Sequence, residues 1–457
     1  MGASTRSPRV RRTTSGDVGA DSRPFALKRN GDSNLSPSLL DVAPVVAANT
    51  GDHALIHPLL LAVHQSPSRE EFQSSLDYPQ YKPTDRLLIR SGSQLLGHVR
   101  LVRRLVQFGE IQIPATALEW LAVLPEYRTT DYRHRLLAAA ESEARADGAE
   151  LVTAMSTDLD VCPEIRGWIA LRDQGYSVSS ARDTLAQLSS TRYRKSFHAR
   201  VWRYVEIGSL IHIYQQQMAR RYGLVVRNDA YWHWLCSRKA YDQILVAIEG
   251  RDTLDYGPSG ATIVGYAVVA GERIVELITL PGHRSAAVPL LAHACRDAME
   301  RNRDTIALHA PPTHPLHELM ITAGGSWRTP TDDAAGVPVI KVLQPSSLVR
   351  RLYPRMHEAA KEAGLSCPLH LGLKIDGQPH RFTLSRRSAR LVAETPEQVD
   401  LRCSGEQFSC LLLGCLDVRR ACEKGTLSVA KKSVTAVLAA LFPTFVYWKS
   451  PLDDWPA

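Results

Sequence analysis

The sequence has no apolar run long enough to cross a bilayer, no Cys-x-x-Cys pair, and no apolar stretch near its start of the kind found in secretory signals. These absences argue against a membrane protein and against a small fold held by disulfides. The eight cysteines are scattered along the chain, as a reducing compartment permits. We therefore predict a cytoplasmic protein whose cysteines belong to its core.

Net charge is also small once the first residues are set aside. The formal charge is +8, but residues 1–30 hold seven basic and two acidic groups, a net +5, which leaves only +3 for the remaining residues. A nearly neutral folded part does not offer a nucleic-acid surface. The start of the chain is rich in Arg and Ser and poor in apolar residues, so residues 1–45 are expected to form a disordered basic tail.

The rest has the composition of a globular protein, with 44% apolar and 22% charged residues, and its length predicts two or three domains. Periodicity in the first unit, 46–190, is typical of an α/β domain. It predicts a helix at 54–63, a hairpin of 86–91 and 95–102, a strand at 115–123, a helix at 131–147, a strand at 150–155 and a helix at 165–172.

A similar order of elements returns in the second unit, 191–345, after a mainly helical stretch at 197–240. This repeated order indicates an internal duplication. The expected elements of the second unit are strands at 243–249, 261–270 and 273–280, a helix at 288–299, a strand at 305–309, a helix at 314–322 and a strand at 339–343.

The pattern of the third unit, 346–457, is typical of an α+β domain. Its expected elements are a helix at 346–363, a meander over 369–393, an edge strand at 399–403 and closing helices at 407–413, 418–423 and 429–441.

A strand with the pattern Leu121-Ala-Val123-Leu-Pro125 leads into Glu-Tyr-Arg128 and then into the helix at 131–147. This stretch resembles the acetyl-CoA loop of the GNAT acetyltransferase superfamily. The resemblance implies that the strand edge pairs with the pantetheine amides and that the turn and helix N-terminus hold the pyrophosphate. The residues it assigns to acetyl-CoA are Leu121, Val123, Arg128, Thr129, Thr130, Asp131 and Arg133.

Further motifs narrow the resemblance. They are Ile213-Tyr214 with Gly223, Arg227 and Trp232, and the tail segments at 408–414, 425–427 and 441–443 with Trp448. Together they resemble the enhanced-intracellular-survival branch of these acetyltransferases. That branch implies two tandem GNAT-like mixed-sheet domains, a sterol-carrier-like α+β domain at the end, and assembly into a homo-oligomer.

The sequence departs from the family pattern in two ways, and the first is in the loop. Asp131 and Arg133 stand where the loop has glycines, and a carboxylate there repels pyrophosphate. Arg128 and Arg133, with the neighbouring His134 and Arg135, could clamp the phosphate through their side chains instead. Asp131 is equally readable as an ordinary helix N-cap, and both interpretations stay open.

The second departure concerns the acid that would protonate the leaving thiolate. The family places a Tyr four residues before a Gly-aromatic pair, here Gly175-Tyr176, but that position is Leu171. Tyr176 is the candidate that we retain, with Tyr127 and Tyr132 also near in sequence. Each of the three phenols also fits a packing role.

Two candidates exist for the base. Glu119 lies on the strand before the loop, where GNAT enzymes can carry a carboxylate, although a solvent-facing residue fits the alternation equally well. The resemblance also implies that the C-terminal carboxylate reaches the site, which nominates Ala457, or else Asp453 and Asp454.

The second unit has Thr279–Arg284 where the phosphate loop would stand, without the glycine spacing, and we interpret this unit as a structural half that shapes the acceptor cleft. His309, His314 and His317 lie near a Pro-rich turn without a nearby cysteine, so no metal is predicted. In the third unit Leu411–Leu413, Leu438 and neighbouring apolar residues fit either a lipid tunnel or a packed core.

The sequence thus predicts an acetyl-CoA-dependent N-acetyltransferase that acts on a primary amine, in a small molecule or a peptide. It needs neither nucleic acid nor membrane. Two alternatives remain open, which are a catalytically degenerate scaffold of the same fold and lipid binding by the third unit.

Overall fold

The computed structural model describes residues 43–127, 131–156, 167–171, 174–190, 197–219, 221–250, 262–329 and 336–454. The protein has a mixed α/β fold with three sheets, and each sheet combines antiparallel pairs with one parallel pair. The expected basic tail, 1–45, lies outside the described residues except for its last three. No helix among the described residues is long and apolar enough to cross a membrane.

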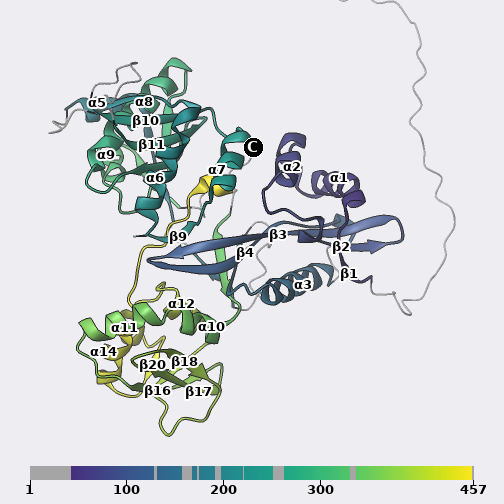
Figure 1. The fold of residues 1–457 in the computed structure, drawn as a ribbon, viewed down its shortest axis with the longest axis vertical. Helices are drawn as coiled ribbons and strands as arrows, with labels where there is room; N and C mark the ends of the chain where they lie inside the picture. Colours follow the sequence, from purple (N-terminus) through teal and green to yellow (C-terminus); the bar gives the residue numbers. More distant parts are fainter. Residues whose placement is uncertain are drawn as a thin grey trace, which may run out of the picture. The chain divides into compact units, whose positions relative to one another are not determined.

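Sheet A contains eight strands and is built mostly from the first third of the chain. Its long hairpin of β3 and β4 forms the centre of the sheet (Figure 1). Across the sheet the order is β1 (Val45–Ala47), β2 (Arg86–Ser91), β3 (Gln94–Phe108), β4 (Ile111–Val123), β5 (Leu151–Met155), β15 (Pro338–Val342) and β6 (Ile169–Ala170), while β9 (Tyr222–Val225) pairs with β3 off this path.

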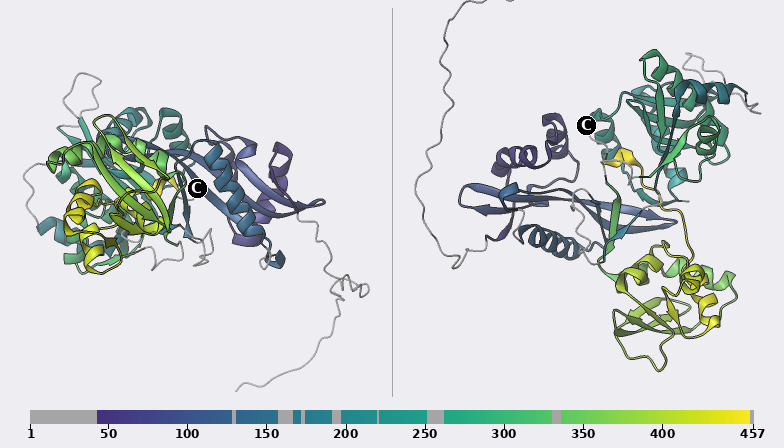
Figure 2. Two further views of the ribbon diagram at one scale, coloured as in Figure 1. Left: turned by 90° about the horizontal axis from the view of Figure 1, so that it is seen from below. Right: turned by 180° about the vertical axis from the view of Figure 1, so that it is seen from behind.

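Helices cover both faces of sheet A. The helices α1 (His53–His64) and α2 (Arg69–Leu76) lie on one face and α3 (Tyr132–Ala146) lies on the other, as two opposite views agree (Figures 1 and 2). A stripe of apolar residues along α3, from Leu136 to Ala144, is buried against the sheet. The helix α2 begins at a capping box, in which Ser68 and Glu71 bond each other's backbone N–H groups.

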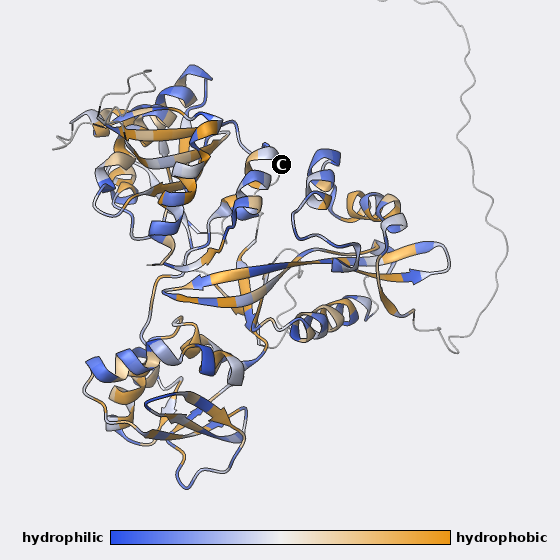
Figure 3. Cartoon of the chain, viewed as in Figure 1, coloured by the Kyte–Doolittle hydropathy of each residue, from blue (hydrophilic) through white to orange (hydrophobic). Residues whose placement is uncertain are grey.

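Sheet B contains seven strands between two helical layers with separate apolar clusters. Its central strands are strongly hydrophobic (Figure 3), as strands covered on both faces must be. The order is β14 (Ser326–Arg328), β7 (Tyr176–Ser180), β13 (Thr305–Leu308), β12 (Arg273–Thr279), β11 (Thr262–Ala270), β10 (Gln243–Glu249) and β8 (His198–Val201); α5 (Ala181–Ser190), α8 (Ala287–Glu300) and α9 (Leu316–Thr322) pack on one face, and α6 (Ile207–Met218) and α7 (Asp229–Ser237) on the other.

Strands cross between the first two sheets: sheet B takes β7 from the stretch 46–190, and sheet A takes β9 and β15 from the stretch 191–345. β7 follows β6 in the chain, yet it pairs with β13 in sheet B, where Val178 faces Ala307. β15 follows β14, yet it pairs with β5 in sheet A, where Ile340 faces Thr153. Boundaries drawn at residues 190 and 345 therefore do not separate the two sheets, and neither sheet is complete without a strand from the other stretch.

Sheet C belongs to the third unit, where five strands pack against five helices. The apolar residues that could have lined a lipid tunnel lie in this core, and the cavity beside Leu411, Leu441 and Phe442 has only about 10 Å³, room for about one water molecule. The strands are β18 (Ala389–Val392), β17 (Gln378–Leu384), β16 (Leu369–Ile375), β19 (Leu401–Cys403) and β20 (Ser428–Val429), and the helices are α10 (Pro345–Arg351), α11 (Tyr353–Glu362), α12 (Gly405–Leu412), α13 (Val418–Glu423) and α14 (Lys432–Leu441).

One expected helix is wrong. The sequence predicts a helix at 165–172, but Ile169 and Ala170 form the short strand β6 against β15. Short apolar runs do not distinguish a buried helix from a buried strand, and the partner strand comes from far along the chain. The stretch 197–240 contains α6 and α7 as expected, but β8 and β9 as well.

A fully buried ion cluster fastens the end of the chain to sheet B. The guanidinium of Arg227 binds Glu276 of β12 at 2.6 and 2.9 Å and Asp453 at 2.9 and 3.0 Å, and all three side chains are fully buried. Ser450 and Tyr231 donate hydroxyl hydrogen bonds to these carboxylates. Every charge in the cluster thus has a partner, which is the condition for burying ions.

We predict that Arg227→Met strongly destabilises the protein, because two buried carboxylates would lose their counter-charge. The loss of unfolding free energy should be about 3–5 kcal/mol, measured by urea denaturation. Arg301→Met, which removes an exposed pair with Asp242 and Asp297, is the matched control and should cost less than about 1 kcal/mol. Equal losses in the two variants would contradict the role given to the cluster.

Candidate functional site

The parallel strands β4 and β5 separate toward their carboxyl ends. Pairing joins Ala115–Ala117 to Leu151–Thr153, and within the described part of the chain no strand covers this edge of β4 farther along. On its other edge β4 stays paired with β3 as far as Val123. Because Leu124 donates its N–H to Leu96 on the β3 side, the N–H of Val123 points to the open edge.

A β-bulge at Trp120 redirects β4 beside this opening. Its φ of 53° lies in the left-handed region, which is strained for a bulky side chain and must be held by contacts. Nδ1 of His98 donates to the Trp120 carbonyl oxygen at 3.0 Å, and Nε2 accepts from Arg86 at 3.1 Å. Burial and the charge of Arg86 hold the pKa of His98 well below its ordinary value, so the ring stays neutral in this tautomer. The bulge thereby sets the direction of Glu119, the residue before it.

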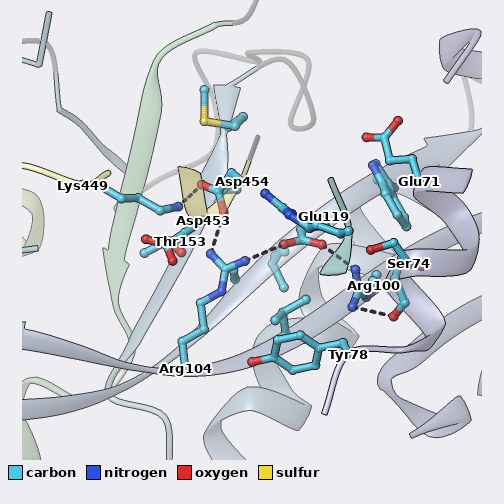
Figure 4. A pocket seen from close by; sticks show the side chains of 18 of the residues that line it. Glu71, Ser74, Tyr78, Arg100, Arg104, Glu119, Thr153, Lys449, Asp453 and Asp454 are labelled. Atoms are coloured by element: carbon cyan, nitrogen blue, oxygen red, sulfur yellow. Dashed lines mark hydrogen bonds and ion pairs between the residues drawn. The ribbon is translucent and has the colours of Figure 1, made fainter. Parts of the chain in front are cut away.

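A cavity of about 240 Å³ opens beside the bulge (Figure 4). Its walls come from sheet A, from α2 and the loop after it, from α7 and from the last segment of the chain, so stretches far apart in sequence meet here. The polar and aromatic residues of its lining are Ser66, Glu71, Ser74, Ser75, Tyr78, Arg100, Arg104, Glu119, Trp120, Thr153, Trp234, Arg238, Lys449, Asp453 and Asp454.

Glu119 lies between two arginines in this cavity, as Figure 4 shows. One carboxylate oxygen accepts from Arg100 at 2.9 Å and the other accepts from Arg104 at 2.8 Å. Arg104 also donates to Asp454 at 2.6 Å, and Asp454 in turn pairs with Lys449. The side chain of Glu119 keeps 23% of its surface exposed, so the carboxylate remains accessible from the cavity.

These pairs fix the charges of the cavity. Burial alone would lower the pKa of Arg104, but Asp454, Tyr231 and Glu119 raise it well above the ordinary value. Burial alone would raise the pKa of Asp454, but Lys449 and Arg104 hold it well below the usual range. Both groups are therefore charged at neutral pH.

The residues expected to bind the cofactor lie along the open edge and the turn beyond it. The side chains of Leu121 and Val123 are buried, and the Leu121 carbonyl accepts from His64 at 3.2 Å. Asp131 occupies the N-cap position of α3 and is exposed, but its side chain makes no capping hydrogen bond. Arg133 lies half-buried in the first turn. Arg128, Thr129 and Thr130 lie outside the described residues.

Of the three catalytic candidates, the two that the structure describes lie in different sheets. Glu119 lines the cavity, but Tyr176 is buried in sheet B, where it stacks on His309 at 4.4 Å between ring centroids. Ala457 lies outside the described residues, although Asp454 reaches the cavity wall. Leu171, at the position where the resemblance places a tyrosine, is buried in an apolar cluster.

The arginines of β3 are functional residues that sequence reasoning missed. Arg100 and Arg104 lie on one face of the strand, and their side chains are only 6% and 4% exposed. Two arginines on one face of an apolar strand require a carboxylate partner when they are buried. This pattern could have identified them from the sequence. The contributions of Trp234, Arg238 and Lys449 left no such signal, because only tertiary structure brings them to the cavity.

The three histidines near the Pro-rich turn have separate partners. His317 bonds Ser177 at 2.8 Å and the Ala310 carbonyl at 3.2 Å, while His309 stacks on Tyr176. Among the residues that the structure describes, no three His, Cys, Asp or Glu side chains are grouped so that they could hold a metal ion.

Residues 53–168 match the family model described as an acetyltransferase (GNAT) domain. This stretch contains the β3–β4 hairpin, the bulge, Glu119 and α3, so the chain carries a GNAT-type domain around the cavity. A comparison with curated proteins finds no match.

Solved structures share the fold over most of the chain. A GCN5-related N-acetyltransferase from Kribbella flavida is 13% identical with a TM-score of 0.63, covering 90% of this chain and 99% of that one. A probable N-acyltransferase of unknown function from Enterococcus faecalis is 14% identical with a TM-score of 0.66, covering 89% and 98%. Eis1 from Mycobacterium abscessus is 14% identical with a TM-score of 0.59, covering 88% and 97%. The similarity in fold therefore extends well beyond residues 53–168.

We predict that Asp454→Asn lowers the melting temperature at neutral pH and that the difference fades in acid. The native pKa of Asp454 lies below its unfolded value of about 3.9, so the carboxylate stabilises the fold above that pH and loses its effect as the pH falls. Melting curves of both proteins between pH 7 and pH 3 measure this. Asp183→Asn, at an exposed position on α5, should show no pH-dependent difference, and a constant difference for Asp454→Asn would contradict the prediction.

Proposed function

We propose that this protein transfers an acyl group, with acetyl as the main candidate, from coenzyme A to a primary amine. The observation that carries the proposal is the open edge of β4, where β5 has separated and the strand runs on toward the N-terminus of α3. The match of residues 53–168 to the GNAT domain supports the same reaction class.

The open edge can bind the extended part of coenzyme A as a strand binds its neighbour. An amide carbonyl of the pantetheine arm would accept from the N–H of Val123, which the β3 ladder leaves unused. The pyrophosphate would then lie at the N-terminus of α3, where the helix dipole and Arg133 favour negative charge. Asp131 is exposed there, so water weakens its repulsion of the phosphate.

Glu119 is the residue that we propose as base. Arg100 and Arg104 hold its carboxylate in place, and each oxygen keeps a lone pair for a water molecule in the cavity. The amine nitrogen forms a bond to the thioester carbonyl carbon and gives its proton through this water to Glu119. The carbon–sulfur bond then breaks, and the thiolate takes a proton from water, since the buried Leu171 leaves no phenol at the expected position.

The acceptor is proposed to be a cationic amine in a small molecule or a peptide. Glu71, Glu119 and Asp454 line the cavity and attract such a group, while the arginines between them limit how many positive charges it accepts. We also propose that the protein assembles into a homo-oligomer, which rests on the family resemblance, and that it is cytoplasmic, which rests on the composition.

We predict that Val123→Pro abolishes acetyl-CoA binding without unfolding the protein. Proline removes the N–H that faces the open edge, whereas the bonds of β4 to β3 do not use that group. Val123→Ala keeps the N–H and is the matched control. Isothermal titration calorimetry should show binding to the wild type and to Val123→Ala only, with circular dichroism confirming that all three fold.

Unchanged affinity in Val123→Pro would refute this placement of the cofactor. A wild type that fails to bind acetyl-CoA even at millimolar concentration would favour the alternative, in which the protein keeps the fold as a scaffold without the chemistry.

We predict that Glu119→Gln lowers kcat for an accepted amine by about 100-fold or more, the usual contribution of a general base, with little change in KM for acetyl-CoA. The neutral amide cannot take the proton, yet it retains the shape of the side chain. Glu143→Gln, at an exposed site on α3, is the control and should leave kcat unchanged. Steady-state release of free thiol measures both, and a normal kcat in Glu119→Gln would exclude Glu119 as the base.

A further inference from the structure

Sheet B has a parallel pair that separates in the same way as the pair in sheet A. β12 pairs with β13 only from Arg273 to Ile274, and the next bond, from the His309 N–H to the Ile274 carbonyl, ends the contact. β12 then continues to Thr279 along β11. Ligands commonly bind outside the carboxyl ends of parallel strands where neighbours diverge, so this second opening is also a candidate binding site.

A cavity of about 260 Å³ lies at this opening. One wall is the end of β12 and the loop that leads into α8, and the others come from α6, the start of β9 and the turn before α9. Trp448, from the last segment of the chain, adds an apolar surface. Among the described residues of the lining, the charged and polar groups include Arg221, Arg284, His314 and Gln217, and none is an Asp or a Glu.

The two arginines of this cavity are not paired with any carboxylate in the described part of the chain. Among the described residues, neither Arg221 nor Arg284 has a carboxylate within ion-pair distance or a side-chain hydrogen bond. Burial lowers the pKa of Arg221, and the positive charge of Arg284 lowers it further, so the two guanidinium groups are close enough to repel each other. Paired cations facing a cavity cost stability unless an anion joins them.

His314 lines the same cavity and carries a hydrogen-bond donor that is unpaired among the described residues. Its Nδ1 accepts from the Leu316 N–H at 3.3 Å, which places the proton of the neutral ring on Nε2. That Nε2 atom is buried and has no hydrogen-bond partner among the described residues. Burial, together with His317, Arg221 and Arg284, lowers the pKa of His314 to about 3, so the ring is a neutral donor at physiological pH.

We propose that this second cavity is a binding site for a phosphoryl group, held by Arg221, Arg284 and the Nε2–H of His314. Two guanidinium groups balance the charge of a phosphate dianion, whereas a carboxylate would neutralise only one of them. The apolar wall of Leu277, Leu280 and Trp448 has room for an organic body attached to that group. The site is separate from the proposed acyl-transfer cavity and does not depend on that function.

This site also changes how the loop before α8 is understood. Thr279–Arg284 lacks the glycine spacing of a loop that binds phosphate through backbone N–H groups, and the sequence alone indicated no anion site there. The structure supplies the positive charge by side chains instead. Arg284 comes from the loop itself, and Arg221 is the residue before β9, in a different part of the chain.

The test measures the binding of inorganic phosphate, phenyl phosphate and coenzyme A to the full chain by calorimetry. We expect phosphate and phenyl phosphate to bind the wild type, and both Arg221→Met and Arg284→Met to weaken them by about tenfold or more, as expected for losing one charge-assisted contact. Arg390→Met, at an exposed position on β18, is the matched control and should bind like the wild type.

A melting curve without ligand separates a ligand site from a merely structural role. If Arg221 serves the ligand and only repels Arg284 in the free protein, Arg221→Met without ligand should melt at the same temperature as the wild type or higher. Adding phosphate should then raise the melting temperature of the wild type but not that of Arg221→Met. Arg284 is exposed, so its variant remains informative even if Arg221→Met folds poorly. Phosphate affinity that is absent from the wild type, or unchanged in both variants, would overturn the proposal.

The three probes distinguish the source of the phosphoryl group. Tighter binding of phenyl phosphate than of inorganic phosphate, lost in both variants, identifies an organic phosphomonoester as the ligand class. Equal binding of the two identifies free phosphate. Coenzyme A binding that falls in Arg284→Met but persists in Val123→Pro would show that a nucleotide phosphate uses this cavity rather than the open edge of β4.

Discussion

The buried charge of Arg227 is the interaction on which the two cavities depend. It satisfies Glu276 inside sheet B and Asp453 in the last segment of the chain, and none of the three side chains touches water. Because a buried carboxylate cannot be left unpaired, the last segment must follow one path. That path brings Asp454 to Arg104 in the first cavity and Trp448 to the wall of the second.

Both cavities open where a parallel strand pair separates, and this feature explains why they lie where they do. Separation leaves backbone groups and space at the carboxyl ends of the strands, and a β-bulge at Trp120 turns Glu119 toward the first opening. The chemistry then differs between the sheets. In sheet A the backbone edge and balanced ion pairs line the opening. In sheet B two arginines line it, and no carboxylate joins them among the lining residues that the structure describes.

Much of the fold could be predicted from the sequence, because local patterns carry it. The hairpin of β2 and β3, the helix α3 with its stripe from Leu136 to Ala144, and β10 at 243–249 all formed where periodicity indicated. The strand β6 was missed because two residues pair with a strand that lies far along the chain. Of the candidate site, Glu119 was found from its place on β4, but its partners Arg100 and Arg104 were not.

The sequence by itself determined the class of fold, the strand β4 with the helix α3 that follows it, and the small net charge beyond residue 30, since each of these depends on neighbouring residues or on composition. Tertiary structure alone decided that β7 and β15 change sheets, that Asp454 meets Arg104, and that Arg221 lies near Arg284. The physical reason is that such contacts join residues far apart in the chain, and their energies depend on burial and on charges that no local pattern contains.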